Sequence, residues 1–216
     1  MKKGFVFDLD GVITDTAKFH YLAWKDLAAE IGIDIDLKFN EQLKGISRMD
    51  SLDRILAYGN KEEAFSTEEK EALATKKNTH YVELLQDLTP ADLLPGVQEF
   101  LEEAQAKNIP CAIASASKNA PFILEKLGVQ EAFAAIVAPA TLTKGKPDPE
   151  IFVRAAEAIN ITPAEAVGFE DAQAGLDGIK AAGMYAVGVY SGEELHGADL
   201  IVNHLTDLSI DELLQK

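Results

Sequence analysis

The chain has 216 residues, of which 47% are hydrophobic and 26% are charged, proportions typical of a folded globular protein. They exclude a collagen-like, low-complexity or disordered chain. Its 36 acidic residues outnumber its 20 basic residues and give a formal net charge of -16. This charge disfavours nucleic acid or an anionic membrane surface as a partner. The length fits one domain that carries an insertion, or two small domains.

Cysteine content and hydropathy indicate the cellular compartment. The single cysteine, Cys111, can form no internal disulfide and lies in an apolar run that predicts a buried thiol. The apolar stretch after the first residues is interrupted by Asp8 and Asp10, unlike the core of a signal peptide. No run approaches the roughly 18 apolar residues of a membrane span. We therefore expect a cytoplasmic protein, and a monomer because no long apolar stripe stands out.

The first element predicted is a short buried strand, Phe5-Val6-Phe7, which ends in an acidic loop from Asp8 to Gly11. Apolar residues then recur at helical spacing in three segments, the first of which has Thr16 as a candidate cap and Gly32 as a stop. These predicted helices cover residues 16–32, 51–58 and 67–85. No strand is predicted between residues 15 and 87.

From residue 90 onward, short apolar runs alternate with helix-like segments, which is typical of a parallel sheet with crossover helices. The predicted strands cover residues 110–114, 135–137, 166–169, 185–189 and 200–202. The predicted helices cover residues 97–107, 121–127, 149–159 and 174–182. Thr162-Pro163-Ala164-Glu165 has the spacing of a capping box with proline at the first helical position, so it predicts a helix start.

The first strand belongs with this later sheet, so the segment between them is an insertion. The predicted fold class is α/β, a Rossmann-like parallel sheet core with an inserted helical cap domain. The core is expected to comprise residues 1–14 and 88–216, and the helical cap residues 15–87.

Polar residues follow the predicted strands at the edge where open parallel sheets bind ligands. They are Asp8 and Asp10 after the first strand, Ser115, Ser117, Lys118 and Asn119 after the second, Lys144 and Lys146 after the third, and Glu170 and Asp171 after the fourth. Clustered carboxylates are costly unless a cation compensates them, and Mg²⁺ prefers such oxygen ligands. Lys146 and the helix start after Ser117 suit a phosphate. Together these groups indicate phosphoryl transfer.

Four of these segments resemble the signature motifs of the haloacid dehalogenase-like superfamily. They are Phe7-Asp8-Leu9-Asp10-Gly11-Val12, Ser115, Lys146 and Glu170-Asp171. The helical insertion resembles the small four-helix cap of that superfamily, so the resemblance covers nearly the whole chain. Further segments resemble its sugar-phosphate mutases. They are Thr16, His20, Leu43-Lys44-Gly45-Ile46-Ser47-Arg48, Ser51, Lys77-Asn78 and Ser115-Ala116-Ser117-Lys118-Asn119.

The resemblance implies that Asp8 attacks a phosphoryl group in line and becomes an aspartyl-phosphate, while Asp10 acts as general acid and base. It implies one Mg²⁺ per active site, held by Asp8, the carbonyl of Asp10 and Asp171, with Glu170 nearby. Lys146 and Ser115 are implied to bind the transferring phosphoryl oxygens.

The implied reaction interconverts β-D-glucose 1-phosphate and D-glucose 6-phosphate, with β-glucose 1,6-bisphosphate as intermediate and activator. Because this small-molecule substrate must bind in two orientations, a second phosphate pocket is expected. The residues expected to form it are Arg48, Ser117, Lys118 and Asn119. The remaining substrate contacts implied are Thr16, His20, Lys44, Gly45, Ser51, Lys77 and Ala116. His20 and Lys77 are implied to link substrate binding to a closure that keeps water from the aspartyl-phosphate.

Ala172 departs from the pattern, because these enzymes often carry a serine after the second acidic residue. Two alternatives remain open. A phosphatase acting on sugar phosphates or phosphoglycolate would use the same aspartyl-phosphate but would not need a second phosphate pocket. A non-catalytic binding domain on the same fold would tolerate loss of Asp8.

Overall fold

The computed structural model describes residues 1–44, 46–192 and 194–216. The chain divides into two compact units. We refer to Met1–Asp15 with Leu88–Lys216 as the sheet unit, and to Thr16–Asp87 as the helical unit. The predicted domain boundaries differ from this division only in the placement of Asp15. The assignment of the helical unit as a cap domain stays a prediction.

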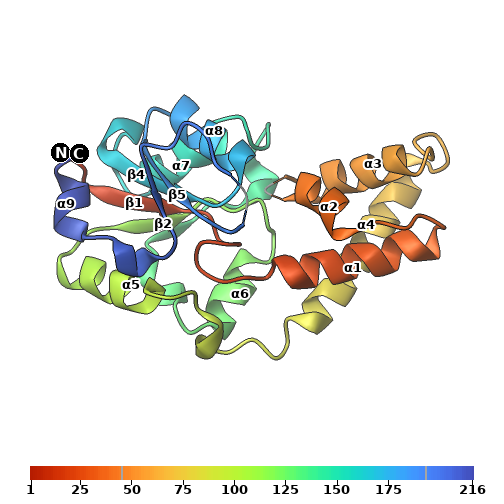
Figure 1. Ribbon diagram of the computed structural model, residues 1–216, viewed down its shortest axis with the longest axis horizontal. Coiled ribbons are helices and arrows are strands. Elements are labelled where there is room, and N and C mark those ends of the chain that lie inside the picture. The colour runs from red at the N-terminus through yellow and green to blue at the C-terminus, as the bar shows by residue number, and fades with distance from the viewer. Residues whose placement is uncertain (45, 193) are drawn as a thin grey trace. The chain divides into compact units, whose positions relative to one another are not determined.

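Within the described residues, the sheet unit contains six parallel strands in the order β3-β2-β1-β4-β5-β6. They are β1 (Gly4–Phe7), β2 (Cys111–Ile113), β3 (Ala135–Ile136), β4 (Ala166–Glu170), β5 (Tyr185–Val189) and β6 (Leu200–Val202). The sheet and the helices around it are shown in Figure 1. This architecture confirms the predicted α/β fold class.

The strand order places a switch point beside β1. The chain passes from β1 to β2 on one side, whereas β4 pairs with β1 on the other side. Phe7 lies in register with Ile113 of β2 and Phe169 of β4. Residues that follow these three strands therefore lie at the same sheet edge, where ligands of open α/β sheets bind.

Helices cover both faces of the sheet. They are α5 (Val97–Ala106), α6 (Ala120–Lys126), α7 (Glu150–Ala158), α8 (Gln173–Ala181) and α9 (Ile210–Leu214). Val6 of β1 packs with residues of α7 and α8. Phe5 and Phe7 instead contact the ring of Phe100 on α5, with centroid distances of 5.1 and 5.9 Å. In Figure 1, α7 and α8 lie on one side of the sheet, and α5 and α6 on the other. Burial on both faces explains why β1 is apolar throughout.

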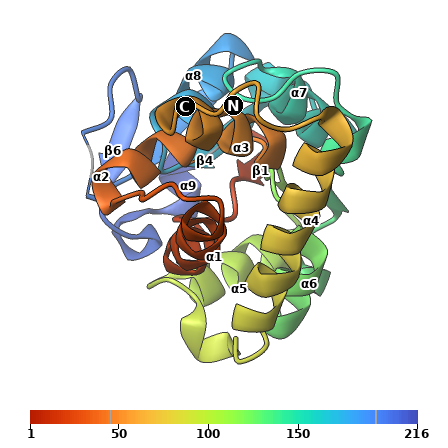
Figure 2. The same ribbon diagram turned by 90° about the vertical axis from the view of Figure 1, so that its right-hand side faces the viewer.

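The helical unit contains four α-helices among its described residues. They are α1 (Ala17–Glu30), α2 (Leu37–Asn40), α3 (Arg48–Tyr58) and α4 (Thr67–Leu84). Both α1 and α3 pack against α4. Figure 2 views α1 end-on. The core of this unit includes Trp24 and Leu27 of α1 with Leu52 and Leu56 of α3. Ser66 and Glu69 form a capping box at the start of α4.

The predicted elements agree with the observed ones to within three residues at each end, with two kinds of difference. The short helices α2 and α9 were not predicted, because so few residues show little helical periodicity. The predicted helix start at Thr162 is confirmed, but it begins a 3₁₀ turn and not an α-helix. Thr162 and Glu165 do form a capping box, but the chain makes only one 3₁₀ turn, Pro163–Glu165, before it enters β4. No strand occurs among the described residues of the helical unit, as predicted.

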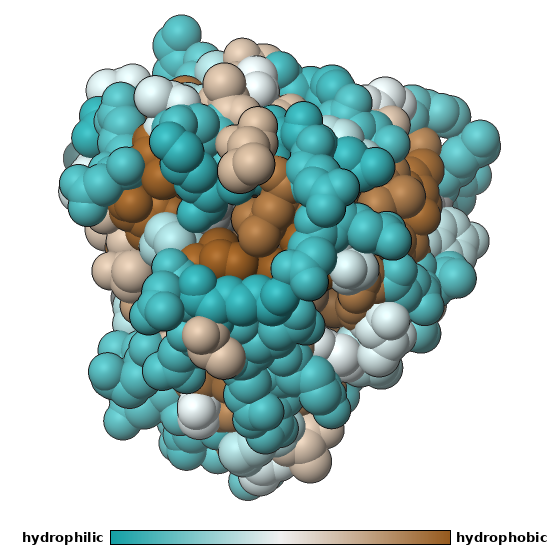
Figure 3. Space-filling view, turned by 90° about the vertical axis from the view of Figure 1, so that its left-hand side faces the viewer, coloured by the Kyte–Doolittle hydropathy of each residue, from teal (hydrophilic) through white to brown (hydrophobic). Residues whose placement is uncertain are grey.

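The face that carries both termini is mostly hydrophilic, and its apolar residues show in several separate areas (Figure 3). None of the helices formed by the described residues has both the length and the apolar character that crossing a lipid bilayer requires.

Candidate active site

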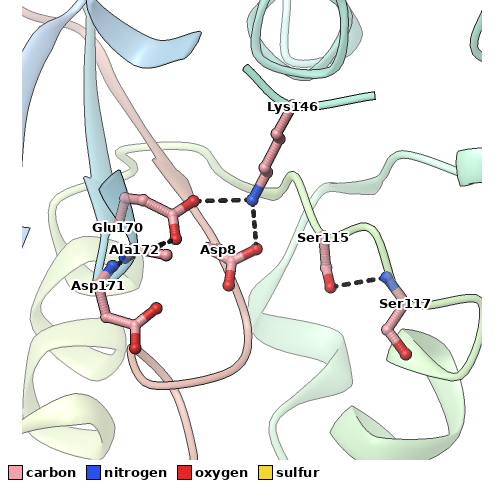
Figure 4. Close-up of polar contacts among 7 residues, drawn as sticks. All are labelled: Asp8, Ser115, Ser117, Lys146, Glu170, Asp171 and Ala172. Atoms are coloured by element: carbon pink, nitrogen blue, oxygen red, sulfur yellow. Dashed lines mark hydrogen bonds and ion pairs between the residues drawn. The ribbon is translucent and has the colours of Figure 1, made fainter. Parts of the chain in front are cut away.

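Three charged side chains meet at the carboxyl ends of β1 and β4. The ammonium nitrogen Nζ of Lys146 donates to Asp8 Oδ1 at 2.6 Å and to Glu170 Oε2 at 2.7 Å. Figure 4 shows Lys146 reaching between the two carboxylates. All three residues are buried, and the Lys146 ammonium also lies 5.0 Å from the ring centroid of Phe152 on α7. The predicted motif residues of three separate segments are thus brought together.

Burial and charge act in opposite directions within this cluster. Burial favours a neutral Lys146, but the carboxylates of Asp8 and Glu170 outweigh it and raise the pKa of Lys146, so the ammonium stays charged. Burial raises the pKa of Glu170, the negative charge of Asp8 raises it further, and the Lys146 ammonium opposes both. A single cation therefore does not fully compensate the buried acids.

Asp171 adds a third carboxylate to the cluster. One carboxylate oxygen from each of Asp8, Glu170 and Asp171 lies within 4.8 Å of the others. Three oxygen donors at this spacing are suited to a hard divalent cation such as Mg²⁺. Because the single ammonium of Lys146 faces three carboxylates, the residues present fit a divalent cation.

Two glycines allow the acidic residues to approach this closely. Gly11 follows Asp10 in the turn after β1 and has φ +79°, and an added Cβ there would lie 2.0 Å from Asp171 Oδ2. Gly175 of α8 lies against Glu170, where an added Cβ would be 1.9 Å from Oε2. Asp10 itself is half-buried in this turn, two residues after Asp8.

Hydroxyl groups follow β2 at the same edge of the sheet. The Ser115 Oγ accepts from the Ser117 backbone N–H at 3.1 Å, so the hydroxyl of Ser115 can in addition donate (Figure 4). The Ser117 Oγ accepts from the Asn119 N–H at 3.2 Å. Ala116 is half-buried and Lys118 is exposed. This turn thus presents several donors near the end of a central strand.

Ala172, which departs from the family pattern, still contributes through its backbone. Its N–H and that of Asp171 both donate to Glu170 Oε1 at 3.2 Å. The Glu170 carboxylate is therefore bound through one oxygen by the backbone and through the other by Lys146.

In the helical unit, His20 of α1 and Lys77 of α4 are in contact. Lys77 Nζ lies 2.7 Å from His20 Nδ1, and 4.7 and 4.6 Å from the ring centroids of Trp24 and Tyr81. The His20 ring stacks on Tyr81 at 4.0 Å. Burial lowers the pKa of His20 well below its usual value, and the positive charges of Lys77 and Arg48 lower it further. His20 is therefore neutral in the folded protein.

Two further predicted residues of the helical unit have defined partners. The guanidinium of Arg48, at the start of α3, donates through Nη2 to Asn78 Oδ1 at 2.7 Å. Thr16, buried just before α1, accepts a hydrogen bond from the Tyr81 hydroxyl at 3.2 Å. Thr16 was predicted as a helix cap, but its side chain makes no capping hydrogen bond, because its hydroxyl faces α4 instead.

The remaining predicted residues of this unit make local contacts. The Ser51 hydroxyl donates to the Ser47 carbonyl at 2.9 Å, as a buried group within α3. Lys44 pairs with Glu41 at 2.5 Å. Gly45, predicted to contact substrate, lies outside the described residues.

Sequence reasoning missed some residues of these two clusters and included one that does not belong. Lys144 is exposed, and its Nζ lies 3.3 Å from Asp148 rather than beside Asp8. Phe152, under the Lys146 ammonium, was not singled out. Neither was Tyr81, although it stands four residues after Lys77 on one helix, a spacing that places both on the same helix face.

The fold and this cluster define a class of protein, and the comparisons with known proteins agree. Residues 2–183 match the haloacid dehalogenase-like hydrolase family, and the chain belongs to this family. The resemblance stated from the motifs is thereby confirmed. Enzymes of this family generally use Mg²⁺, in accord with the carboxylates at the end of β1 and β4.

Within the family, the chain is similar to β-phosphoglucomutases. That of Bacillus subtilis strain 168 is 49% identical over 98% of this chain and 93% of the relative. The crystal structure of β-phosphoglucomutase from Clostridium difficile is 47% identical, with a TM-score of 0.96 over 100% of this chain and 96% of that chain. A phosphorylated carbohydrates phosphatase from Thermotoga maritima is 28% identical over 83% of this chain and 81% of the relative.

Proposed function

We propose that the protein acts as a β-phosphoglucomutase, interconverting β-D-glucose 1-phosphate and D-glucose 6-phosphate. The observation that carries the proposal is the buried Lys146 ammonium between Asp8 and Glu170, beside the carboxylate of Asp171. The identity of 49% to a β-phosphoglucomutase over nearly the whole chain supports the choice of substrate.

In the first step, a carboxylate oxygen of Asp8 attacks the phosphorus of a sugar phosphate in line. The bond between phosphorus and the sugar oxygen breaks, and Asp10 donates its proton to that oxygen. An aspartyl-phosphate at Asp8 and a free sugar hydroxyl result. Because Lys146 holds Asp8 at a fixed place, the nucleophile does not have to be reoriented for each turnover.

The productive cycle starts from this phospho-enzyme. Asp10 takes the proton from the 6-hydroxyl of β-glucose 1-phosphate as that oxygen attacks the aspartyl-phosphate, which gives β-glucose 1,6-bisphosphate and free Asp8. The bisphosphate turns round, and its 1-phosphate is transferred to Asp8, so that glucose 6-phosphate leaves. Traces of the bisphosphate activate the enzyme because they phosphorylate Asp8 directly.

We propose that one Mg²⁺ per active site is held by Asp8, the backbone carbonyl of Asp10 and Asp171, with Glu170 adjacent. When bound, the ion withdraws charge from the phosphoryl oxygens and reduces their repulsion of the Asp8 carboxylate. Glu170 supports this arrangement indirectly, since its oxygens already accept hydrogen bonds from Lys146 and from two backbone N–H groups.

The remaining roles are those that the resemblance to the family implies. Lys146 and Ser115 are proposed to bind the oxygens of the transferring phosphoryl group. The phosphate that is not transferred is proposed to bind Ser117, Lys118 and Asn119 of the sheet unit and Arg48 of the helical unit. The other proposed substrate contacts are Thr16, His20, Lys44, Gly45, Ser51, Lys77 and Ala116.

The test is a single reaction mixture of purified protein, Mg²⁺, β-glucose 1-phosphate and a trace of β-glucose 1,6-bisphosphate. Glucose 6-phosphate and inorganic phosphate are followed together. Rapid formation of glucose 6-phosphate with little free phosphate is the expected result. Free phosphate without glucose 6-phosphate would instead show that water accepts the phosphoryl group, as in a phosphatase.

We also propose that the enzyme is cytoplasmic, which is supported by the one cysteine, Cys111, being buried and free. We propose in addition that it is a monomer. Light scattering after size-exclusion chromatography measures the oligomeric state.

A further inference from the structure

The loop that leads to Lys146 is exposed, although the side chain of Lys146 is buried. Thr143, Lys144 and Gly145 all face solvent, whereas the Lys146 ammonium contacts Asp8 and Glu170 in the interior. Apolar burial therefore does not fix these three residues. Polar contacts are what place the backbone from which Lys146 extends.

Glu150 supplies these contacts. Its Oε2 accepts from the Thr143 N–H at 2.9 Å, from the Thr143 hydroxyl at 2.7 Å and from the Lys144 N–H at 3.0 Å. Its Oε1 accepts from Arg154 Nη2 at 2.8 Å, one turn further along α7. Glu150 is the first residue of α7. Its carboxylate therefore connects the start of this helix to Thr143 and Lys144, which precede Lys146 in the sequence.

Two further hydrogen bonds connect residues within the segment from Gly145 to Glu150. The Glu150 N–H donates to Asp148 Oδ1 at 3.0 Å, and the Asp148 N–H donates to the Gly145 carbonyl at 3.0 Å. The Thr143 hydroxyl, followed by the backbone N–H groups of Lys144 and Thr143 and by Arg154, lowers the pKa of Glu150 to about 2. Glu150 is thus ionised at any working pH, and hydrogen bonds to an ionised acceptor are the strong ones.

We propose that Glu150 is a positioning residue for Lys146: by holding Thr143 and Lys144, it sets where the Lys146 ammonium meets Asp8 and the phosphoryl group. This inference rests on the proposed function, in which Lys146 binds the transferring phosphoryl oxygens. A misplacement of about 1 Å at a catalytic group can lower the rate by about a hundredfold. The loss of the Glu150 side chain, which lies outside the cluster, would then appear as a catalytic defect.

The experiment compares Glu150→Ala with Lys146→Ala and with the double variant. We expect Glu150→Ala to lower kcat by roughly tenfold to a hundredfold with little change in KM, because Lys146 acts on the reacting group. In the Lys146→Ala background, Glu150→Ala should lower kcat by less than about twofold, since the residue that it positions is already gone. Glu150→Gln, whose carbonyl oxygen still accepts, should recover part of the activity.

Glu165 provides a matched control in the same unit. Its Oε2 accepts from the Thr162 N–H and hydroxyl at 3.0 Å each, and its Oε1 pairs with Lys3 at 2.5 Å. It precedes β4 and so lies at the end of the strand away from Glu170. Glu165→Ala should lose stability in the same way as Glu150→Ala but keep the wild-type kcat.

The inference is overturned if Glu150→Ala and Glu165→Ala have the same kcat, or if the losses from Glu150→Ala and Lys146→Ala multiply in the double variant. Should the wild-type protein transfer no phosphoryl group, the proposed function fails, and the inference is decided by orthovanadate affinity in magnesium buffer. The inference is supported if the affinity for orthovanadate is weaker in Glu150→Ala than in the wild-type protein but unchanged in Glu165→Ala. Equal affinities, or no binding by the wild-type protein, refute it.

Discussion

Replacement of Gly175 by alanine tests how tightly the buried ion pairs are packed. The added Cβ would lie 1.9 Å from Glu170 Oε2 and 2.2 Å from Glu170 Cδ, whereas ordinary contact begins at 3.4 Å. The Glu170 carboxylate must therefore move by about 1.5 Å if the helix stays in place. Where that displacement points away from Lys146, it takes the oxygen from 2.7 Å to about 4 Å from Lys146 Nζ, the limit of an ion pair.

The magnitude follows from two opposing effects. Separating the two partners of a buried ion pair lowers the free energy of unfolding by about 3 to 5 kcal/mol, because the charges stay buried without compensation. Alanine in place of glycine within a helix contributes about 1 kcal/mol in the stabilising direction. We expect Gly175→Ala to lower the free energy of unfolding by about 2 to 4 kcal/mol, measured by urea denaturation. Turnover should fall at least about tenfold, because Lys146 loses one of its two carboxylate partners.

Glu170→Ala provides the background that isolates this effect. When the Glu170 carboxylate is absent, the Cβ added at Gly175 has no side chain to displace, so Gly175→Ala should leave stability unchanged or raise it by about 1 kcal/mol. The reasoning is wrong if Gly175→Ala destabilises the protein equally in both backgrounds. It is also wrong if the single variant has wild-type stability and turnover.

Three other measurements address the remaining groups. Asp8→Asn should abolish phosphoryl transfer, by roughly a thousandfold or more, with an unchanged circular dichroism spectrum, and measurable turnover at the wild-type rate would exclude Asp8 as the nucleophile. The pKa of His20 is lowered in the folded protein, so the unfolded chain binds the proton more readily and this contribution to stability is lost as the pH falls below about 6.5. NMR titration should show a neutral His20 ring at that pH, and Lys77→Met should raise its pKa; an unchanged pKa would exclude the Lys77 contact as a cause. Burial raises the pKa of Cys111 to about 12, so a thiol reagent at about pH 8 should label Cys111 only after unfolding, and rapid labelling of the folded protein would contradict its burial.

The sheet and the edge that carries the chemistry could be predicted because both depend on local patterns. β1 is apolar at every position and stops at Asp8, and β4 is followed directly by Asp171. Parallel strands bring their carboxyl ends to one edge, so residues far apart in the sequence converge there without any knowledge of side-chain contacts. Lys146 could be included because it follows the third predicted strand after a loop, but that position did not predict its burial between Asp8 and Glu170.

Contacts made by side chains that reach across the fold could not be predicted in this way. Lys144 and Lys146 have the same charge and stand two residues apart, yet one is exposed and the other is buried between carboxylates. We attribute the difference to the contacts of Glu150 with the backbone of the loop. In the sequence, Glu150 cannot be distinguished from any other acidic residue at a helix start. In the sequence, Tyr81 likewise resembles any other apolar residue of α4. Its stacking on His20 depends on how α1 packs against α4.

The charge of the site explains how an acidic protein can act on an anionic sugar phosphate. The net charge of -16 repels phosphate at long range, but such repulsion between exposed charges is screened within about 8 Å at physiological salt. At the cluster itself, three carboxylates face the single ammonium of Lys146, and a divalent cation would compensate the remaining negative charge. In the proposed function, the attraction for a phosphate therefore comes from groups in direct contact with it, such as Lys146 and Ser115, and depends on where they are held. For this reason Glu170 and Glu150, which hold Lys146 in place, influence the proposed reaction in addition to the charge that Lys146 itself carries.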